Sequence, residues 1–237
     1  MVYLAALAVT SVFALRPEWS IGALLVFAAP AGAITPTLAI MFKARIERNI
    51  LNVVSTSLLV PLTMPLLFYY IIGSRLPVEY GSMFSFLAIF ILVPYLASIT
   101  CKRYLNRRVA EIEPHIPTGA IVILLFTMFG VGSGVSAEML ADMPLVLEIL
   151  LIYLVAFAVT FSSGWLLALK KDLPDRMSAL ILTTWKNNSL AIVLAYQFFR
   201  ETEPLIVFFA ALSTIPWNLA FVPARWMATK LNGTASG

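Results

Sequence analysis

The residues Thr183–Ala191, TTWKNNSLA, interrupt the segment Met177–Phe199, which is otherwise apolar enough to span a membrane. A lysine near the centre of a spanning helix costs about 2.5–3.5 kcal/mol, and such a charge by default marks a substrate path or an ion site. A second interruption, Pro30–Pro36 or PAGAITP, lies in an earlier apolar segment. Two broken spans toward opposite ends of one chain indicate a secondary transporter, with its binding site where the two spans cross.

The composition is that of an integral membrane protein. Hydrophobic residues make up 61% of the chain, charged residues make up 12%, and the mean hydropathy is +0.93. Apolar stretches of about 20 residues predict helices, whereas a membrane barrel needs short alternating strands. We therefore predict an all-α, polytopic membrane protein without a soluble domain. Its single cysteine, Cys101, excludes an internal disulfide and a cysteine-based metal cluster.

The basic residues predict the orientation of the chain, whose formal net charge is +4. Eight apolar spans are predicted, at residues 2–15, 20–42, 50–72, 83–100, 117–136, 144–169, 177–199 and 205–228. Ten basic residues follow spans two, four and six, and two more close the chain at the end of span eight; the twelve are Lys43, Arg45, Arg48, Lys102, Arg103, Arg107, Arg108, Lys170, Lys171, Arg176, Arg225 and Lys230. The alternate loops hold Arg16, Arg75 and Arg200. By the positive-inside rule, we expect both chain ends on the cytoplasmic side of a bacterial-type inner membrane. The expected partner of these basic residues is membrane lipid, and no nucleic acid is expected.

The first three and the last three spans form a predicted inverted repeat. The two triplets start from opposite sides of the membrane, and the middle span of each is broken, so a pseudo-two-fold axis brings the breaks together near the midplane. We predict a core domain of residues 1–73 and 142–231 and a reduced panel domain of residues 83–136. The symmetric form of this fold needs two more helices at the N-terminus, either missing from this sequence or lost in a reduced variant. The short first span, without a signal-peptide pattern, favours the former.

The two breaks define the predicted binding site. Pro30 and Pro36 remove backbone donors, and the freed carbonyls suit a cation while helix N-termini suit an anion. Lys186 is either a fixed charge that attracts an anionic substrate or a proton carrier that replaces a bound ion. A lysine that snorkels to an interface from the end of a shorter helix is the structural alternative. The predicted substrate- and ion-binding residues are Ala33, Ile34, Thr35, Pro36, Thr37, Asn49, Ser57, Thr183, Thr184, Lys186, Asn187, Asn188 and Ser189.

Glu148 is a second candidate for an intramembrane charge, about one turn into the sixth span. It either relays protons or pairs with Lys186, or it is an interfacial carboxylate that faces the outer headgroups. Further hydroxyls in the spans, including that of Thr56, are expected mostly to bond carbonyls of their own helix. No cofactor is expected, and the coupling ion is predicted to be sodium or a proton.

The run APAGAITPTLAIMFKARIERNILNVVSTSLLVPLTMPLL, residues 29–67, resembles two helices of a known family. These are the fourth and fifth helices of the bile acid:sodium symporter family, with a pattern close to CPGG…SN…T and then ST-L-x-x-P-L-x-x-P. The matching positions are Pro30, Gly32, Ser55, Thr56, Leu58, Pro61, Leu62 and Pro65. FILVPYLASITCKRYL is similar to the sixth helix, and KNNSLAIVLA is similar to the ninth-helix motif Q-N-S-G-L-A. The resemblance runs from the family's third helix onward; arsenite permeases and auxin-efflux-type carriers share the fold.

The resemblance implies a ten-helix fold in which a core moves against a panel, with sodium and substrate near the crossed helices. Several of the implied sodium ligands differ here. Thr183 stands where the family has a sodium-binding glutamate, and Asn187 stands where it has glutamine. Thr35 and Pro36 replace a Ser-Asn pair, and the hydroxyl positions of the fifth helix are occupied by Asn49 and Val53. We infer that sodium coupling is weakened or lost, and that Lys186 supplies the positive charge that a sodium ion supplies in the family.

These observations predict a secondary active transporter of a small organic anion. The alternative within transport is an efflux carrier for arsenite or another oxyanion, although Cys101 lies far from the predicted crossing. A non-transporting membrane binding or sensor module is the alternative from another class. An enzyme is not expected, because the only histidine, His115, lies in a polar loop without a catalytic partner pattern.

Overall fold

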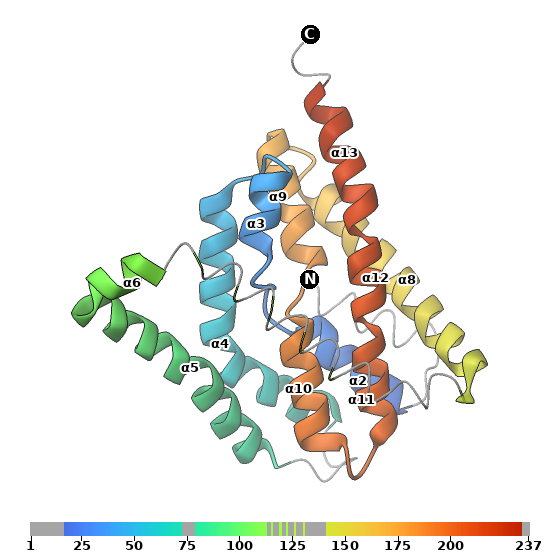
Figure 1. Ribbon diagram of the computed structural model, residues 1–237. Coiled ribbons are helices and arrows are strands. Elements are labelled where there is room, and N and C mark those ends of the chain that lie inside the picture. The colour runs from blue at the N-terminus through green and yellow to red at the C-terminus, as the bar shows by residue number, and fades with distance from the viewer. Residues whose placement is uncertain are drawn as a thin grey trace. The chain divides into compact units, whose positions relative to one another are not determined.

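The computed structural model describes residues 17–72, 79–112 and 141–233, together with the single positions 115, 119, 122, 126 and 130 (Figure 1). The described segments are helical. In chain order the helices are α2 (Pro17–Ala28), α3 (Thr35–Met41), α4 (Ile46–Ile72), α5 (Tyr80–Tyr104), α6 (Asn106–Ile112), α8 (Met143–Leu167), α9 (Leu173–Thr184), α10 (Asn188–Phe199), α11 (Pro204–Leu212), α12 (Thr214–Leu219) and α13 (Phe221–Gly233). Within these ranges, four helical stretches are long and apolar enough to cross a membrane. The predicted all-α membrane class is confirmed.

Two of the predicted spans are broken where the sequence indicated. The span predicted at 20–42 is divided into α2 and α3, and the span predicted at 177–199 is divided into α9 and α10. The last span, predicted as one helix at 205–228, consists of α11, α12 and α13 in succession. The span predicted at 2–15 lies outside the described residues, and only single positions of the span at 117–136 are described. The inverted repeat stays a prediction.

The chain divides into two compact units. Unit 1 contains Met1–Leu59 and Met143–Gly237, and unit 2 contains Val60–Asp142. The division falls within α4, just before its internal prolines Pro61 and Pro65, whereas the sequence prediction placed the end of the first core segment at residue 73. Both breaks therefore lie in unit 1, and unit 2 contains the C-terminal part of α4 with α5 and α6.

Unit 1 is held together by packing between helices that are far apart in the sequence. Helix α8 packs along α9, α2 packs against α10 and α11, and α3 packs against α9. The half-helices on one side of the two breaks are thus neighbours, as are those on the other side. Aromatic side chains fill the core beside α2: the Tyr153 hydroxyl donates a hydrogen bond of 2.9 Å to the Phe209 carbonyl, and the two rings lie 4.7 Å apart.

Helices α8 and α9 approach each other closely at Gly164, and this limits the size of the residue that the position accepts. A Cβ atom at Gly164 would lie 2.1 Å from the Thr183 hydroxyl oxygen and 2.9 Å from the Ala179 carbonyl oxygen. These distances are well inside van der Waals contact, and one of them is to backbone, so a side chain here forces the helices apart.

We predict that Gly164→Ala lowers the free energy of unfolding by about 1–3 kcal/mol, because overpacking a close helix contact strains both helices. The measurement is the melting temperature of the purified protein in detergent. Gly81→Ala on α5 is the matched control, since a Cβ there meets nothing within 4 Å. A melting temperature of Gly164→Ala equal to that of the control would contradict the close contact.

Candidate functional site

The two breaks lie side by side and pair through their backbones. Residues 29–34 separate α2 from α3, and residues 185–187 separate α9 from α10. Ala31 and Lys186 form an antiparallel bridge, flanked by a hydrogen bond of 3.0 Å from the Gly32 amide to the Trp185 carbonyl. The Asn187 amide donates a second bond, of 2.8 Å, to the Pro30 carbonyl. Backbone groups freed by each break are therefore satisfied by the other, and the predicted crossing of two discontinuous helices is confirmed.

Gly32 is required by the closeness of this pairing. A Cβ atom at Gly32 would lie 3.0 Å from the Lys186 carbonyl oxygen and 3.3 Å from its carbon, both backbone atoms. The absence of a side chain at residue 32 lets the two strands approach to hydrogen-bonding distance. In the sequence, Gly32 matches the family pattern, but that match alone does not indicate this close backbone approach.

Helix α4 fastens the first break through Thr56. The Ala31 amide donates a hydrogen bond of 3.2 Å to the Thr56 hydroxyl oxygen, which itself donates a bond of 2.7 Å to the Asn52 carbonyl. The sequence prediction placed Ser57 in the site and left Thr56 as general polar lining. Both belong to one run of hydroxyl residues, and the pattern alone does not specify which of them faces the break.

The second break places Lys186 at the crossing. Its ammonium group donates a hydrogen bond of 3.2 Å to the Leu182 carbonyl, one turn earlier in α9, and the residue is half-buried. Asn187 caps α10, because its side-chain oxygen accepts a bond of 3.1 Å from the Leu190 amide. The positive ends of α3 and α10 and the negative ends of α2 and α9 meet at the crossing, so its net positive charge comes from the Lys186 ammonium group.

Three buried polar atoms beside the breaks have no hydrogen-bond partner within the described protein. They are the hydroxyl oxygens of Thr35 and Thr184 and the side-chain oxygen of Asn188. Thr35 and Thr184 are both completely buried. Thr35 begins α3, Thr184 ends α9 and Asn188 begins α10, so all three border the crossing. A buried oxygen without a partner costs free energy, and a bound cation or solute that donates to it removes this cost.

The other predicted site residues fall into two groups. Ala33, Ile34, Thr37 and Ser189 are exposed, and Pro36 is half-buried. The Thr183 hydroxyl instead donates to the carbonyls of its own helix at Ala179 and Leu180 and lies against α8. Glu148 is exposed on the second turn of α8 and takes part in none of the ion pairs of the described residues. Its role as a proton relay stays a prediction.

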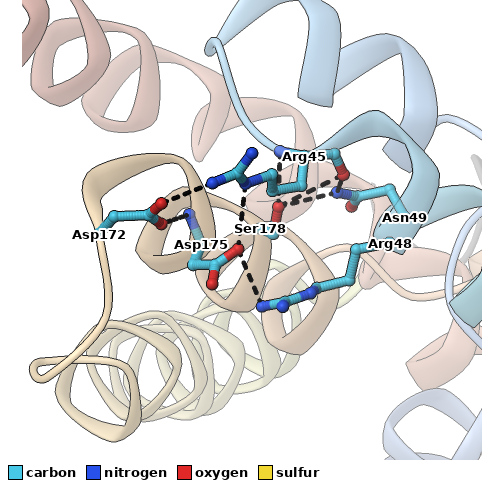
Figure 2. A network of polar contacts seen from close by, with 6 residues as sticks. All are labelled: Arg45, Arg48, Asn49, Asp172, Asp175 and Ser178. Carbon is cyan, nitrogen blue, oxygen red and sulfur yellow. Dashed lines mark hydrogen bonds and ion pairs between the residues drawn. The ribbon is translucent and has the colours of Figure 1, made fainter.

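Asn49 belongs to a separate polar network, shown in Figure 2. Its side-chain amide donates to the Arg45 carbonyl at 2.8 Å and to the Ser178 hydroxyl at 3.2 Å, and its own oxygen is buried without a partner in the protein. The Ser178 hydroxyl also accepts a bond of 2.9 Å from the Arg45 amide. The start of α4 is thereby attached to the first turns of α9. Ser178 had no signal in the sequence, because an isolated small polar residue in a helix fits many roles.

Ion pairs extend this network into the loops. Arg45 contacts Asp172 at 2.6 Å and Asp175 at 3.4 Å, and Arg48 contacts Asp175 at 3.1 Å. Asp172 also caps α9, because it accepts a bond of 2.9 Å from the Asp175 amide. This backbone bond, together with the bond from Arg45, holds the pKa of the Asp172 carboxyl below its ordinary value. The sequence identified these arginines only as markers of topology.

Comparisons with known proteins show similarity to sodium-dependent transporters. The model of the sodium bile acid symporter family matches residues 1–143. The chain is 24% identical over 208 residues to an uncharacterized sodium-dependent transporter, YocS, of Bacillus subtilis, covering 87% of this chain and 63% of YocS. It is 28% identical over 179 residues to the probable chloroplastic sodium/metabolite cotransporter BASS5 of Oryza sativa, covering 71% of this chain and 43% of the rice protein. The chain thus spans less than two thirds of these relatives, which are transporters and not enzymes.

We predict that Thr56→Val lowers the free energy of unfolding by about 1–3 kcal/mol, because the Ala31 amide loses its acceptor while the side-chain shape is kept. Thermal unfolding in detergent measures the loss. Ser55→Ala is the control on the same helix, since this exposed hydroxyl bonds only the Leu51 carbonyl. Equal melting temperatures for the two variants would show that Thr56 does not support the break.

We predict that Asp172→Asn weakens the dependence of stability on acid pH. The folded-state pKa of Asp172 is lowered, so its carboxylate stabilises the fold above about pH 4, and this contribution is lost as the pH falls through the folded-state pKa. Asparagine keeps the helix cap but not the charge. The measurement is the melting temperature between about pH 3 and pH 6.

Glu201→Gln, at an exposed ion pair with Arg200, is the control for removal of one carboxylate. It is expected to keep the wild-type pH profile. If Asp172→Asn keeps that profile as well, the carboxylate does not contribute through ionisation.

Proposed function

The chain belongs to the sodium bile acid symporter family, and on this premise we propose that it is a secondary active transporter of a small organic anion. Its substrate site is the crossing of the two broken spans. The observation that carries the proposal is the antiparallel bridge between Ala31 and Lys186, because it places two sets of helix ends and a lysine in one place. Crossed half-helices of this kind are the usual binding sites of secondary transporters.

Two features of the crossing favour an anion as substrate. Lys186 supplies a positive charge, and the amide end of α10, which begins at Asn188, adds the positive end of a helix dipole. In this proposal, a solute approaches the charge past the exposed residues Ala33, Ile34, Thr37 and Ser189. Ile34 is 50% exposed and offers an apolar contact for the carbon skeleton of an organic acid.

Sodium is the proposed co-substrate, and its coupling is proposed to be weak. The family description and the names of the relatives refer to sodium. The unpartnered oxygens of Thr35, Thr184 and Asn188 are ligands of the type that hard cations prefer, but all three are neutral. The Thr183 hydroxyl bonds its own helix and supplies no carboxylate. A neutral oxygen site beside an ammonium group holds a cation less tightly than a site with a carboxylate, because the two positive charges repel.

The proposal is tested by transport and binding measurements on the purified chain in liposomes. Aliphatic, aromatic and steroid carboxylates are screened for uptake and for an increase in melting temperature, each in sodium and in potassium buffer. For an anion that is taken up or raises the melting temperature, Lys186→Gln is expected to weaken binding at least about tenfold, because it removes the charge at the crossing. Lys43→Gln, at an exposed position in the loop after α3, is the charge-matched control and should bind like the wild type.

Steep dependence of uptake on external sodium, together with full activity of Lys186→Ala, would contradict both the weak coupling and the role of the lysine. Anion binding without uptake would instead favour a binding or sensor module over a transporter.

A further inference from the structure

The turn between α8 and α9 combines basic, aromatic and apolar side chains at the end of a membrane span. Helix α8 ends at Leu167 and α9 begins at Leu173. Trp165 lies in the last turn of α8, Arg176 lies in the first turn of α9, and the exposed Lys170 and Lys171 lie in the turn between them. We name Trp165, Leu166, Leu169, Lys170, Lys171 and Arg176 the α8–α9 turn cluster.

The Arg176 guanidinium is held by stacking rather than by an acid. Its central carbon lies 3.9 Å from the centroid of the Trp165 ring, and its Nε atom is buried without a hydrogen-bond partner in the protein. A stacked guanidinium keeps its outer N–H groups free in a fixed orientation, which suits the oxygens of a phosphate. Tryptophan is also the residue that prefers the depth of lipid headgroups.

The acidic residues closest in sequence do not neutralise this cluster. Asp172 pairs with Arg45, and Asp175 pairs with Arg45 and Arg48, so both carboxylates are engaged with α4 and the loop before it. Neither Lys170 nor Lys171 forms an ion pair within the part of the chain that the structure describes. Two exposed lysines and one stacked arginine therefore leave an excess of positive charge at this turn.

Apolar side chains continue from the cluster onto the membrane span. Leu166 is 59% exposed and Leu169 is 52% exposed, and they flank the end of a span with high hydropathy. A small soluble anion has no apolar part that would contact these leucines. A phospholipid has both a charged headgroup and acyl chains. Along the chain, the exposed leucines come before the lysines, just as the acyl chains of a lipid come before its headgroup on the way out of the membrane.

We propose that the α8–α9 turn cluster is a binding site for an anionic phospholipid. Lys170, Lys171 and Arg176 hold the headgroup phosphate, the Trp165 ring fixes the guanidinium at headgroup depth, and Leu166 and Leu169 contact the acyl chains. The site is in unit 1 and does not involve the crossing, so it is independent of the transported substrate.

Titration of the detergent-solubilised full chain with phosphatidylglycerol and with phosphatidylcholine, followed by native mass spectrometry, tests the site. The wild type is expected to bind phosphatidylglycerol at least about tenfold more tightly than phosphatidylcholine, since basic side chains attract anionic headgroups. The double variant Lys170→Gln/Lys171→Gln is expected to lose about tenfold in affinity for phosphatidylglycerol and to bind phosphatidylcholine unchanged. Arg176→Lys, which keeps the charge but not the planar stack, should give a smaller loss.

Lys102→Gln/Arg103→Gln, which removes two charges from the end of α5, is the matched control. An equal loss of phosphatidylglycerol binding in this control would overturn the proposal, because any exposed basic residues would then attract the anionic headgroup equally well. Equal affinities of the wild type for the two lipids would overturn it as well. So would thermal stabilisation by inorganic phosphate as large as that by phosphatidylglycerol, since the cluster would then bind a free anion. All substituted lysines are exposed, so the variants are expected to fold.

Discussion

The structure of unit 1 depends on one requirement, that backbone groups in an apolar interior find hydrogen-bond partners. Each break frees amides and carbonyls where membrane lipid offers none, and each such group left unpaired costs several kilocalories per mole. The breaks meet this requirement with each other, through the pairing of Pro30–Gly32 with Trp185–Asn187. The same contact joins the two half-helix pairs on either side of the breaks.

Several side chains act on this pairing from outside. Thr56 satisfies the amide of Ala31, Gly32 permits the close approach, and Asn187 caps the helix that follows. The polar network of Arg45 and Ser178 fixes the distant ends of the same helices, beyond α3 and at the start of α9. Two sets of contacts therefore fix the backbone that carries Lys186, Thr35 and Thr184: the pairing of the two breaks, and the polar network of Arg45 and Ser178.

The sequence was sufficient to predict the class of fold and the crossing of the two broken spans. Proline pairs and an intramembrane lysine are strong local signals, because each conflicts with a continuous apolar helix. Which hydroxyl of α4 faces the break, Thr56 or Ser57, depends on the rotation of a helix that is polar over several consecutive positions. The Thr183 hydroxyl bonds its own helix, since Gly164 brings α8 against it, and contacts between distant segments leave no pattern in one sequence. Ser213 and Ala220 keep helical backbone angles, so the last predicted span, 205–228, remains one apolar helical stretch although it is divided into α11, α12 and α13.

Helix α4 is shared by units 1 and 2, and its two prolines lie just beyond the division at Leu59. A proline at position i gives no amide to the carbonyl at i−4, so Pro61 and Pro65 leave the carbonyls of Ser57 and Pro61 without their helical bonds. A helix with two consecutive gaps in its bonding has a lower bending stiffness there than along Ile46–Ser55. Elastic deformation of α4 is therefore concentrated at the junction of the two units, while the stiffer N-terminal part keeps Thr56 against the first break.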